Sequence, residues 1–122
     1  MKSILLLFSL VFLALPLHAA PMLVVEASLT EKHADNSTDK WKAKPITVAD
    51  GTPAIFHRGG LILKVTPASM EKGIVAVPML ITRGTGQNAR LLGRPTVTTR
   101  PGQVVGVGID NLQFTVVVTV AK

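Results

Sequence analysis

The sequence predicts an all-β fold, either a small antiparallel sandwich or a partly open barrel, built from about seven or eight short strands. Three observations support this prediction. Apolar and β-branched residues recur in short runs, turn-forming residues separate these runs, and the last run alternates apolar with polar side chains. Such alternation is typical of a strand that buries one face, because successive side chains point to opposite sides.

The clearest strand is residues 112–120. One face of this strand would carry Leu112, Phe114, Val116, Val118 and Val120, and the other would carry Gln113, Thr115 and Thr119, with Val117 as the exception. The pattern predicts that the first face is buried.

Other runs rich in β-branched residues predict further strands at residues 22–29, 45–49, 54–57, 61–66, 74–82, 95–99 and 104–109. Turn sequences such as Asp50-Gly51, Pro101-Gly102 and Asp110-Asn111 separate them. Pro78 interrupts the run at residues 74–82. Because proline has no N–H to donate to a ladder, we expect this run to form an edge strand or to carry a bulge at Pro78.

Residues 30–44 are polar, carry charges of both signs and show no hydrophobic period. They predict a long loop with at most one helical turn, since Ser28 and Glu31 form a weak capping box. Trp41, the only tryptophan, would anchor this loop on the sheet. Stacking on a ligand is the less favoured role for its ring.

The first residues resemble a signal peptide at residues 1–19, which leaves a single β-rich domain at residues 20–122. Lys2 precedes an apolar run at residues 4–17, and Ala19 offers a small residue for cleavage. We therefore expect an exported protein, located in the periplasm, without a transmembrane span after cleavage. The chain has no cysteine, which excludes both a disulfide and a lipoprotein anchor.

A weak internal repeat links residues 44–56 with residues 94–107. Each segment predicts a strand, a glycine turn and a second strand, with Lys44-Pro45 and Arg94-Pro95 at the two starts. In this alignment one extra residue precedes Gly102, the counterpart of Gly51. Because a hairpin can recur by chance in a β-rich chain, duplication and coincidence are both open at this point.

The side chains that carry catalytic chemistry are scarce. The sequence therefore predicts no enzymatic activity, no cofactor site and no metal site. Nucleophilic catalysis needs a Ser or Cys beside a base, but after the leader only His33 and His57 remain as imidazoles, and no nucleophile motif occurs. No His or Met spacing is typical of metal ligands. The acidic residues form no evident catalytic pair.

Basic residues form two groups that are candidates for an interaction surface. Lys40, Lys42 and Lys44 surround Trp41, and Arg90 and Arg94 lie in a second cluster between residues 83 and 100. Nucleic acid is not an expected partner, because binding to single strands usually adds aromatic stacking platforms and aromatic residues make up only 4% of the chain. An acidic protein or anionic lipid is compatible with the charge, as is a purely solubilising role.

Four segments resemble those of a known family. GLILKVTP at residues 60–67 with GIVAV at residues 73–77, and RPTVTTRPGQVV at residues 94–105, are similar to segments of bacterial secretins, the pore proteins of type II and type III secretion systems. DGTPAI at residues 50–55 follows the same pattern. Secretins are several times longer, so the resemblance implies a free-standing periplasmic relative instead of a pore.

These observations together predict a non-enzymatic β-domain of the periplasm that interacts with another envelope protein through strand edges or its basic loop. The alternative is a small periplasmic carrier of a ligand or metal that uses Trp41, His33 and His57.

Overall fold

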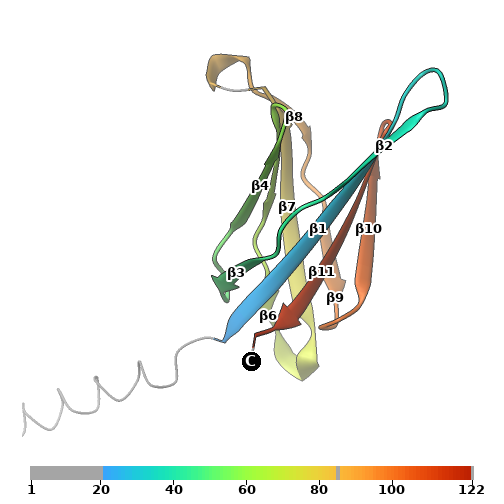
Figure 1. Cartoon of the computed structure of the whole chain (residues 1–122). Coiled ribbons are helices and arrows are strands. Elements are labelled where there is room, and N and C mark those ends of the chain that lie inside the picture. Colours follow the sequence, from blue (N-terminus) through green and yellow to red (C-terminus); the bar gives the residue numbers. More distant parts are fainter. Residues whose placement is uncertain (1–20, 85, 122) are drawn as a thin grey trace, which may run out of the picture.

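Two antiparallel sheets pack face to face in the computed structural model, which describes residues 21–84 and 86–121 (Figure 1). The signal peptide predicted at residues 1–19 lies outside the described residues. The described chain contains eleven strands and two short 3₁₀ turns, Glu71–Gly73 and Gly86–Asn88. The predicted number of about seven or eight strands was too low, because β2, β6 and β8 were not expected as strands. The sheets do not close into a barrel, so of the two expected architectures the antiparallel sandwich is confirmed.

Sheet A contains β1 (Met22–Lys32), β2 (Thr38–Lys42), β3 (Ile46–Ala49), β10 (Val104–Ile109) and β11 (Leu112–Val120). Its order is β10-β11-β1, and the remaining side of β1 pairs with two short strands. β2 lies along the C-terminal part of β1 and β3 along its N-terminal part. Together β2 and β3 therefore form one interrupted edge strand.

Sheet B contains β4 (Ala54–Arg58), β5 (Leu61–Val65), β6 (Ala68–Ser69), β7 (Val75–Arg83), β8 (Arg90–Gly93) and β9 (Thr96–Thr99). β7 is its central strand, with β5 and β6 on one side and β8 and β9 on the other. β4 pairs with β5 and forms the outer edge on that side.

The core lies between the two sheets and is built from every second residue of their strands. The largest fully buried side chains are Phe114, Leu23, Ile81, Val25, Val65, Val77, Val116, Val118 and Pro67. Full burial of such an aliphatic or aromatic side chain contributes about 1.5–3 kcal/mol. This apolar layer therefore stabilises a fold that has no cysteine for a disulfide.

The prediction of a long loop at residues 30–44 is wrong. β1 continues to Lys32, β2 occupies residues 38–42, and only residues 33–37 form the turn between them. The capping box at Ser28 and Glu31 does not start a helix, because both residues lie in β1. Pairing with the long β1 provides partners for the backbone of this polar segment, so tertiary pairing overrides its composition.

The expectation for Pro78 is also wrong, because β7 is a central strand and its only bulge lies between Ile81 and Thr82. The neighbouring strand is interrupted opposite Pro78, where residues 66 and 67 link β5 to β6. The carbonyl of Pro78 accepts a bond from Thr66 at 3.0 Å, while the next residue, Met79, donates to Pro95 on the other side. The missing N–H of Pro78 therefore faces the interruption and costs no ladder bond.

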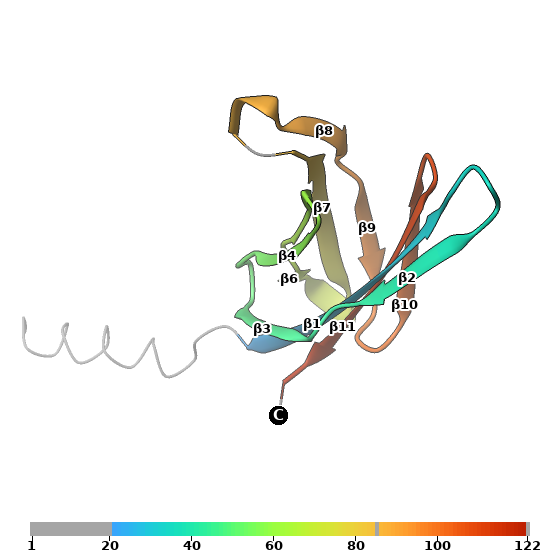
Figure 2. The same ribbon diagram turned by 45° about the horizontal axis from the view of Figure 1, so that its top comes forward.

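The two halves of the described chain have the same topology (Figures 1 and 2). In the first half β1, β2 and β3 lie in sheet A, and β4 and β5 lie in sheet B. In the second half β7, β8 and β9 lie in sheet B, and β10 and β11 lie in sheet A. The pair Val25–Ile46 of the first half corresponds to Val77–Val97 of the second.

The repeated segments are therefore corners between the sheets and not hairpins. Both corners use a glycine with positive φ, 82° at Gly51 and 87° at Gly102. The N–H of Gly51 donates to the carbonyl of Pro67 at 2.8 Å, and that of Gly102 donates to Val118 at 2.9 Å. The ladders match Ile46 with Val97, so the sequence alignment was wrong by one residue and no extra residue precedes Gly102.

Equivalent contacts close the two sides of the sandwich. Between β2 and β4, the guanidinium of Arg58 lies 5.6 Å from the centre of the Trp41 ring. Between β8 and β10, Ile109 packs so closely on Gly93 that an added Cβ would lie 2.6 Å from its Cδ1. Each side of the sandwich therefore has a side-chain contact between the two sheets, without ladder pairing between them.

Candidate interaction surfaces

The basic residues predicted to interact do not form one patch. Lys40 and Lys42 lie on β2, on the outer face of sheet A, and Lys44 lies exposed between β2 and β3. Arg90 begins β8 and Arg94 follows its end, so these two belong to sheet B. The two predicted groups are therefore on different sheets.

Trp41 points away from the lysines that precede and follow it. It is directly opposite the buried Leu29 in the ladder, so its ring faces the core side of sheet A and packs against the core cluster. The Arg58 guanidinium lies over the ring, 5.6 Å from its centre. This placement supports the anchoring role expected from the sequence, but the residue anchors a strand instead of a loop.

The two histidines are on different sheets. His33, in the turn after β1, donates from Nε2 to the Asp39 carboxylate at 2.8 Å, and this bond raises the pKa of His33 above its ordinary value. In the same turn, hydrogen bonds from the Ser37 hydroxyl and N–H lower the pKa of the Asp35 carboxyl. His57 lies on β4, in sheet B. Among the described residues, no three His, Cys, Asp or Glu side chains gather as metal ligands would.

The free edge of β10 is the first surface that the structure adds. β10 pairs only with β11, through a two-residue turn that joins Ile109 to Leu112. The residues that flank such a turn, Ile109 and Leu112, form a hydrogen-bonded pair. Hydrogen-bonded and non-hydrogen-bonded pairs alternate along an antiparallel ladder, so the N–H and C=O groups of Val104, Gly106 and Gly108 point away from β11. These groups form a row that has no ladder partner in the described chain.

β10 differs from the other three sheet edges in having no charged residue and no proline within the strand itself. In the described chain, the other edges carry charges within their strands, Asp39, Lys40 and Lys42 on β2, Arg90 on β8 and Arg58 on β4, and Pro53, Arg94 and Pro95 lie next to these strands. The charge next to β10 is that of Asp110, in the turn that follows the strand. Charges and prolines protect edge strands from pairing with other chains. The β10 edge lacks this protection, and Val104 is 68% exposed.

The side chains beside this edge leave its backbone accessible. Gly106 and Gly108 present no side chain on the outer face, and the amide of Gln113 from β11 lies over both of them. An added Cβ would lie 3.0 Å from this amide at Gly106 and 3.1 Å at Gly108. No side chain of Gly106 or Gly108 therefore flanks the outward N–H and C=O groups of these two residues.

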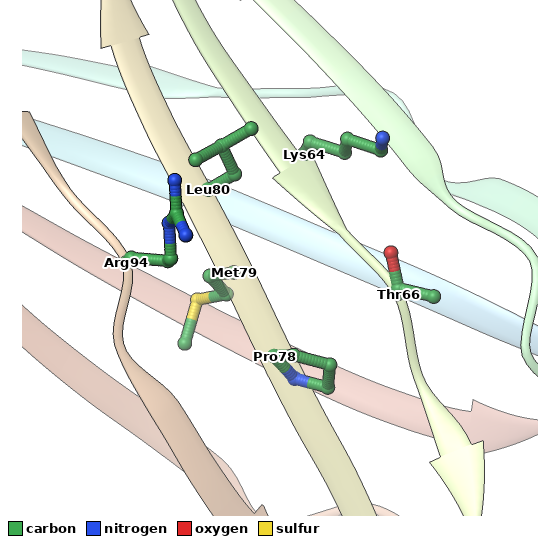
Figure 3. Close-up of a pocket in the computed structure, with 6 residues that line it drawn as sticks. All are labelled: Lys64, Thr66, Pro78, Met79, Leu80 and Arg94. Atoms are coloured by element: carbon green, nitrogen blue, oxygen red, sulfur yellow. The ribbon is translucent and has the colours of Figure 1, made fainter. Parts of the chain in front are cut away.

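The outer face of sheet B is the second surface. One row across the sheet runs Ile55, Lys64, Leu80, and the next runs His57, Ile62, Thr82, Leu91. Arg94 lies beyond Leu80, where Lys64, Pro78, Leu80 and Arg94 help to line a shallow depression of about 230 Å³ (Figure 3). Leu91 and Ile55 are about half exposed.

Sheet B contains no acidic residue in any of its strands. Its strands carry Arg58, Lys64, Arg83 and Arg90, whereas Glu26, Glu31 and Asp39 all lie in sheet A. The lack of acids at residues 51–70 and 72–109 is visible in the sequence. The sequence prediction included Arg94 but not the rest of this surface, because the acids were considered only as a possible catalytic pair and not for their absence from these residues.

Comparisons with protein-family models, with curated proteins and with solved structures gave no match for this chain. Within the described residues, no helix has the length and apolar character needed to cross a bilayer.

Proposed function

We propose that this chain is an exported periplasmic interaction module without an enzymatic activity of its own. It binds another envelope protein when a strand of that partner pairs with the free edge of β10. One observation carries the proposal: among the edges of the described sandwich, β10 alone has neither a charge nor a proline within its strand. An extended segment that pairs with such an edge gains main-chain hydrogen bonds, the basis of strand-addition complexes.

Two further observations favour this function. The two imidazoles of the described residues do not share a site, since His33 bonds to Asp39 in the turn between β1 and β2 and His57 lies on β4 of the other sheet. The export signal predicted at residues 1–19 and the resemblance to secretins are in keeping with a partner in the cell envelope. The lysines of β2 remain the alternative contact, because they were predicted to interact and are exposed.

The test uses the natural difference between β4 and β10. Val104→Pro places at β10 the residue that β4 has at the equivalent position, Pro53, and the start of a strand tolerates proline. Val104→Lys is the second variant, which protects the edge by charge without changing the backbone. Captured proteins from envelope extracts are identified by mass spectrometry, and the partner is then titrated in purified form.

We expect both Val104 variants to weaken partner binding at least tenfold, because each blocks strand pairing. The matched control is the triple replacement of Lys40, Lys42 and Lys44 by Glu, which should leave binding within about threefold. Loss only in the lysine variant would contradict the role of the edge and assign the contact to β2. Absence of any partner for the wild-type protein would contradict the proposed function itself.

A further inference from the structure

We infer that the outer face of sheet B is a second binding surface, which takes an acidic, amphipathic segment of a protein partner. This surface lies on the other sheet from β10 and does not depend on the strand addition proposed above. Its defining residues are two cations, Lys64 and Arg94, and the aliphatic side chains Ile55, Ile62, Leu80 and Leu91.

The arrangement of charge favours an acidic partner. Lys64 on β5 and Arg94 after β8 lie on opposite sides of β7, so their backbones are about 10 Å apart at the usual strand spacing. Neither cation has a carboxylate partner within salt-bridge distance among the described residues, since the ion pairs involve His33 and Arg83 only. Both charges are therefore available to carboxylates of another molecule.

The apolar residues define the rest of the partner. Leu80 lies between Lys64 and Arg94 at the depression shown in Figure 3, with Pro78 beside it. Ile55 and Leu91 extend the apolar surface on either side and are 45% and 51% exposed. A segment with an aliphatic side chain between two carboxylates would bury apolar area over Leu80 and place its charges near Lys64 and Arg94.

A protein segment fits this surface better than a lipid headgroup layer. Surfaces that insert into the membrane interface usually present Trp, Tyr or Phe beside their cations. The aromatic residues of the described chain point elsewhere, because Phe56 and Phe114 are buried and Trp41 belongs to sheet A. The same lack of aromatic side chains argues against single-stranded nucleic acid.

The test follows backbone amide signals of the exported protein by NMR during titration with two synthetic peptides. One peptide repeats Glu-Ser-Leu-Ser, so that an extended chain carries Glu and Leu in turn along one face, and the other has Lys in place of every Glu. We expect the Glu peptide to shift the amides of Ile62, Lys64 and Leu80, and the Lys peptide to shift none of them. Binding should weaken as salt is raised, because exposed ion pairs are screened.

Two sets of variants separate the contributions. Lys64→Glu with Arg94→Glu should weaken binding of the Glu peptide at least tenfold, whereas the matched pair Lys40→Glu with Lys42→Glu on sheet A should change it less than twofold. Ile55→Ser with Leu91→Ser should also weaken binding several-fold. If only the charge reversals had an effect, the apolar part of the proposal would be wrong.

Three outcomes would overturn the inference: no binding of the Glu peptide, equal binding of both peptides, or shifts confined to sheet A. Vesicles of equimolar phosphatidylcholine and phosphatidylglycerol form the last arm. Vesicle binding that depends on Lys64 and Arg94 while the peptide fails would assign the surface to lipid instead. Because Val104→Pro leaves this face unchanged, a failure here is distinguishable from a failure of the proposed function.

Discussion

The strands β4 and β10 occupy equivalent places in the two halves of the molecule, yet their free edges differ. Pro53, Ile55 and His57 of the first half correspond to Val104, Gly106 and Gly108 of the second, as the two-residue turns at Arg58–Leu61 and Ile109–Leu112 establish. At the edge of β4, Pro53 has no N–H to donate, and the side chains of Ile55 and His57 lie beside the backbone. The edge of β10 has neither feature, so the fold repeats its topology without repeating the protection of its edges.

The inner faces of the same two hairpins show the opposite behaviour, because their packing is preserved. In the first, Phe56 on β4 lies opposite Leu63 on β5. In the second, Val107 on β10 lies opposite Phe114 on β11. Each hairpin supplies one phenylalanine and one aliphatic residue, in reversed order. The requirement to fill the core is thus common to both halves, while the exposed edges are free to differ.

Removal of either phenylalanine should have the largest effect on stability. Phe114→Ala and Phe56→Ala should each lower the free energy of unfolding by about 3–5 kcal/mol, because both rings are buried and leave a cavity. Urea denaturation measures the change. Val104→Ala serves as the control and should stay within about 0.5 kcal/mol of the wild type, since its side chain is exposed. A large loss for one phenylalanine only would break the equivalence of the hairpins.

Replacement of the corner glycines should have a smaller and nearly equal effect. Gly51→Ala and Gly102→Ala each force an L-residue to adopt positive φ, at a cost of about 1–2 kcal/mol. An added Cβ would meet nothing within 4 Å at either glycine, so backbone strain alone is measured. Thermal or urea unfolding of both variants gives the comparison. Costs that differ by more than about twofold would show that the corners are not energetically equivalent.

The contact between Arg58 and Trp41 should contribute about 0.5–1 kcal/mol, the usual range for an exposed cation–π pair. Arg58→Met removes the cation but keeps an unbranched side chain over the ring. Because Trp41 is the only tryptophan, its fluorescence spectrum should shift in this variant. Lys42→Met on the outer face of the neighbouring edge provides the control. Unchanged fluorescence in Arg58→Met would mean that the ring is not covered in solution.

The smallest effect concerns the turn between β1 and β2. Hydrogen bonding to Asp39 raises the pKa of His33 above its ordinary value of about 6.5. A raised folded-state pKa stabilises the fold fully below about pH 6.5, and this stabilisation is lost as pH rises through the raised pKa. Asp39→Asn should return the pKa of His33 toward its ordinary value in an NMR titration. The equivalent turn at residues 84–89 has no ionisable side chain and provides no such dependence.

Local patterns predicted much of the fold. The alternation at residues 112–120 gave the buried face of β11 except at Val120, which is 51% exposed at the strand end. The strand at residues 104–109 has the predicted bounds. Strand β2 was missed because its polar residues show no period by themselves, and its conformation depends on pairing with β1. The central position of Pro78 could not be predicted either, since it depends on an interruption in a neighbouring strand.

The candidate surfaces were predicted less well, because they depend on which strands are edges and which face is outermost. The spacing of Lys40, Lys42 and Lys44 indicated one exposed face, but it could not show that Arg90 and Arg94 lie on the other sheet. The uncharged run of Val and Gly at residues 104–109 was visible in the sequence. Its significance arises only because β10 has no second neighbouring strand within residues 21–84 and 86–121.

The ladder between β1 and β11 joins the first and last strands of the described chain along nearly their whole lengths. Sheet A therefore cannot form completely before β11 is present. Neither half can provide all ladder partners for its own central strand, because β1 pairs with β11 of the second half and β7 pairs with β5 of the first. Contacts so distant in sequence slow folding, because a long loop must be closed before they form. A chain that ends before β11 would leave the backbone groups on one side of β1 without a ladder partner. Truncation before β11 should therefore promote aggregation more than disruption of the turn between β4 and β5 or between β10 and β11.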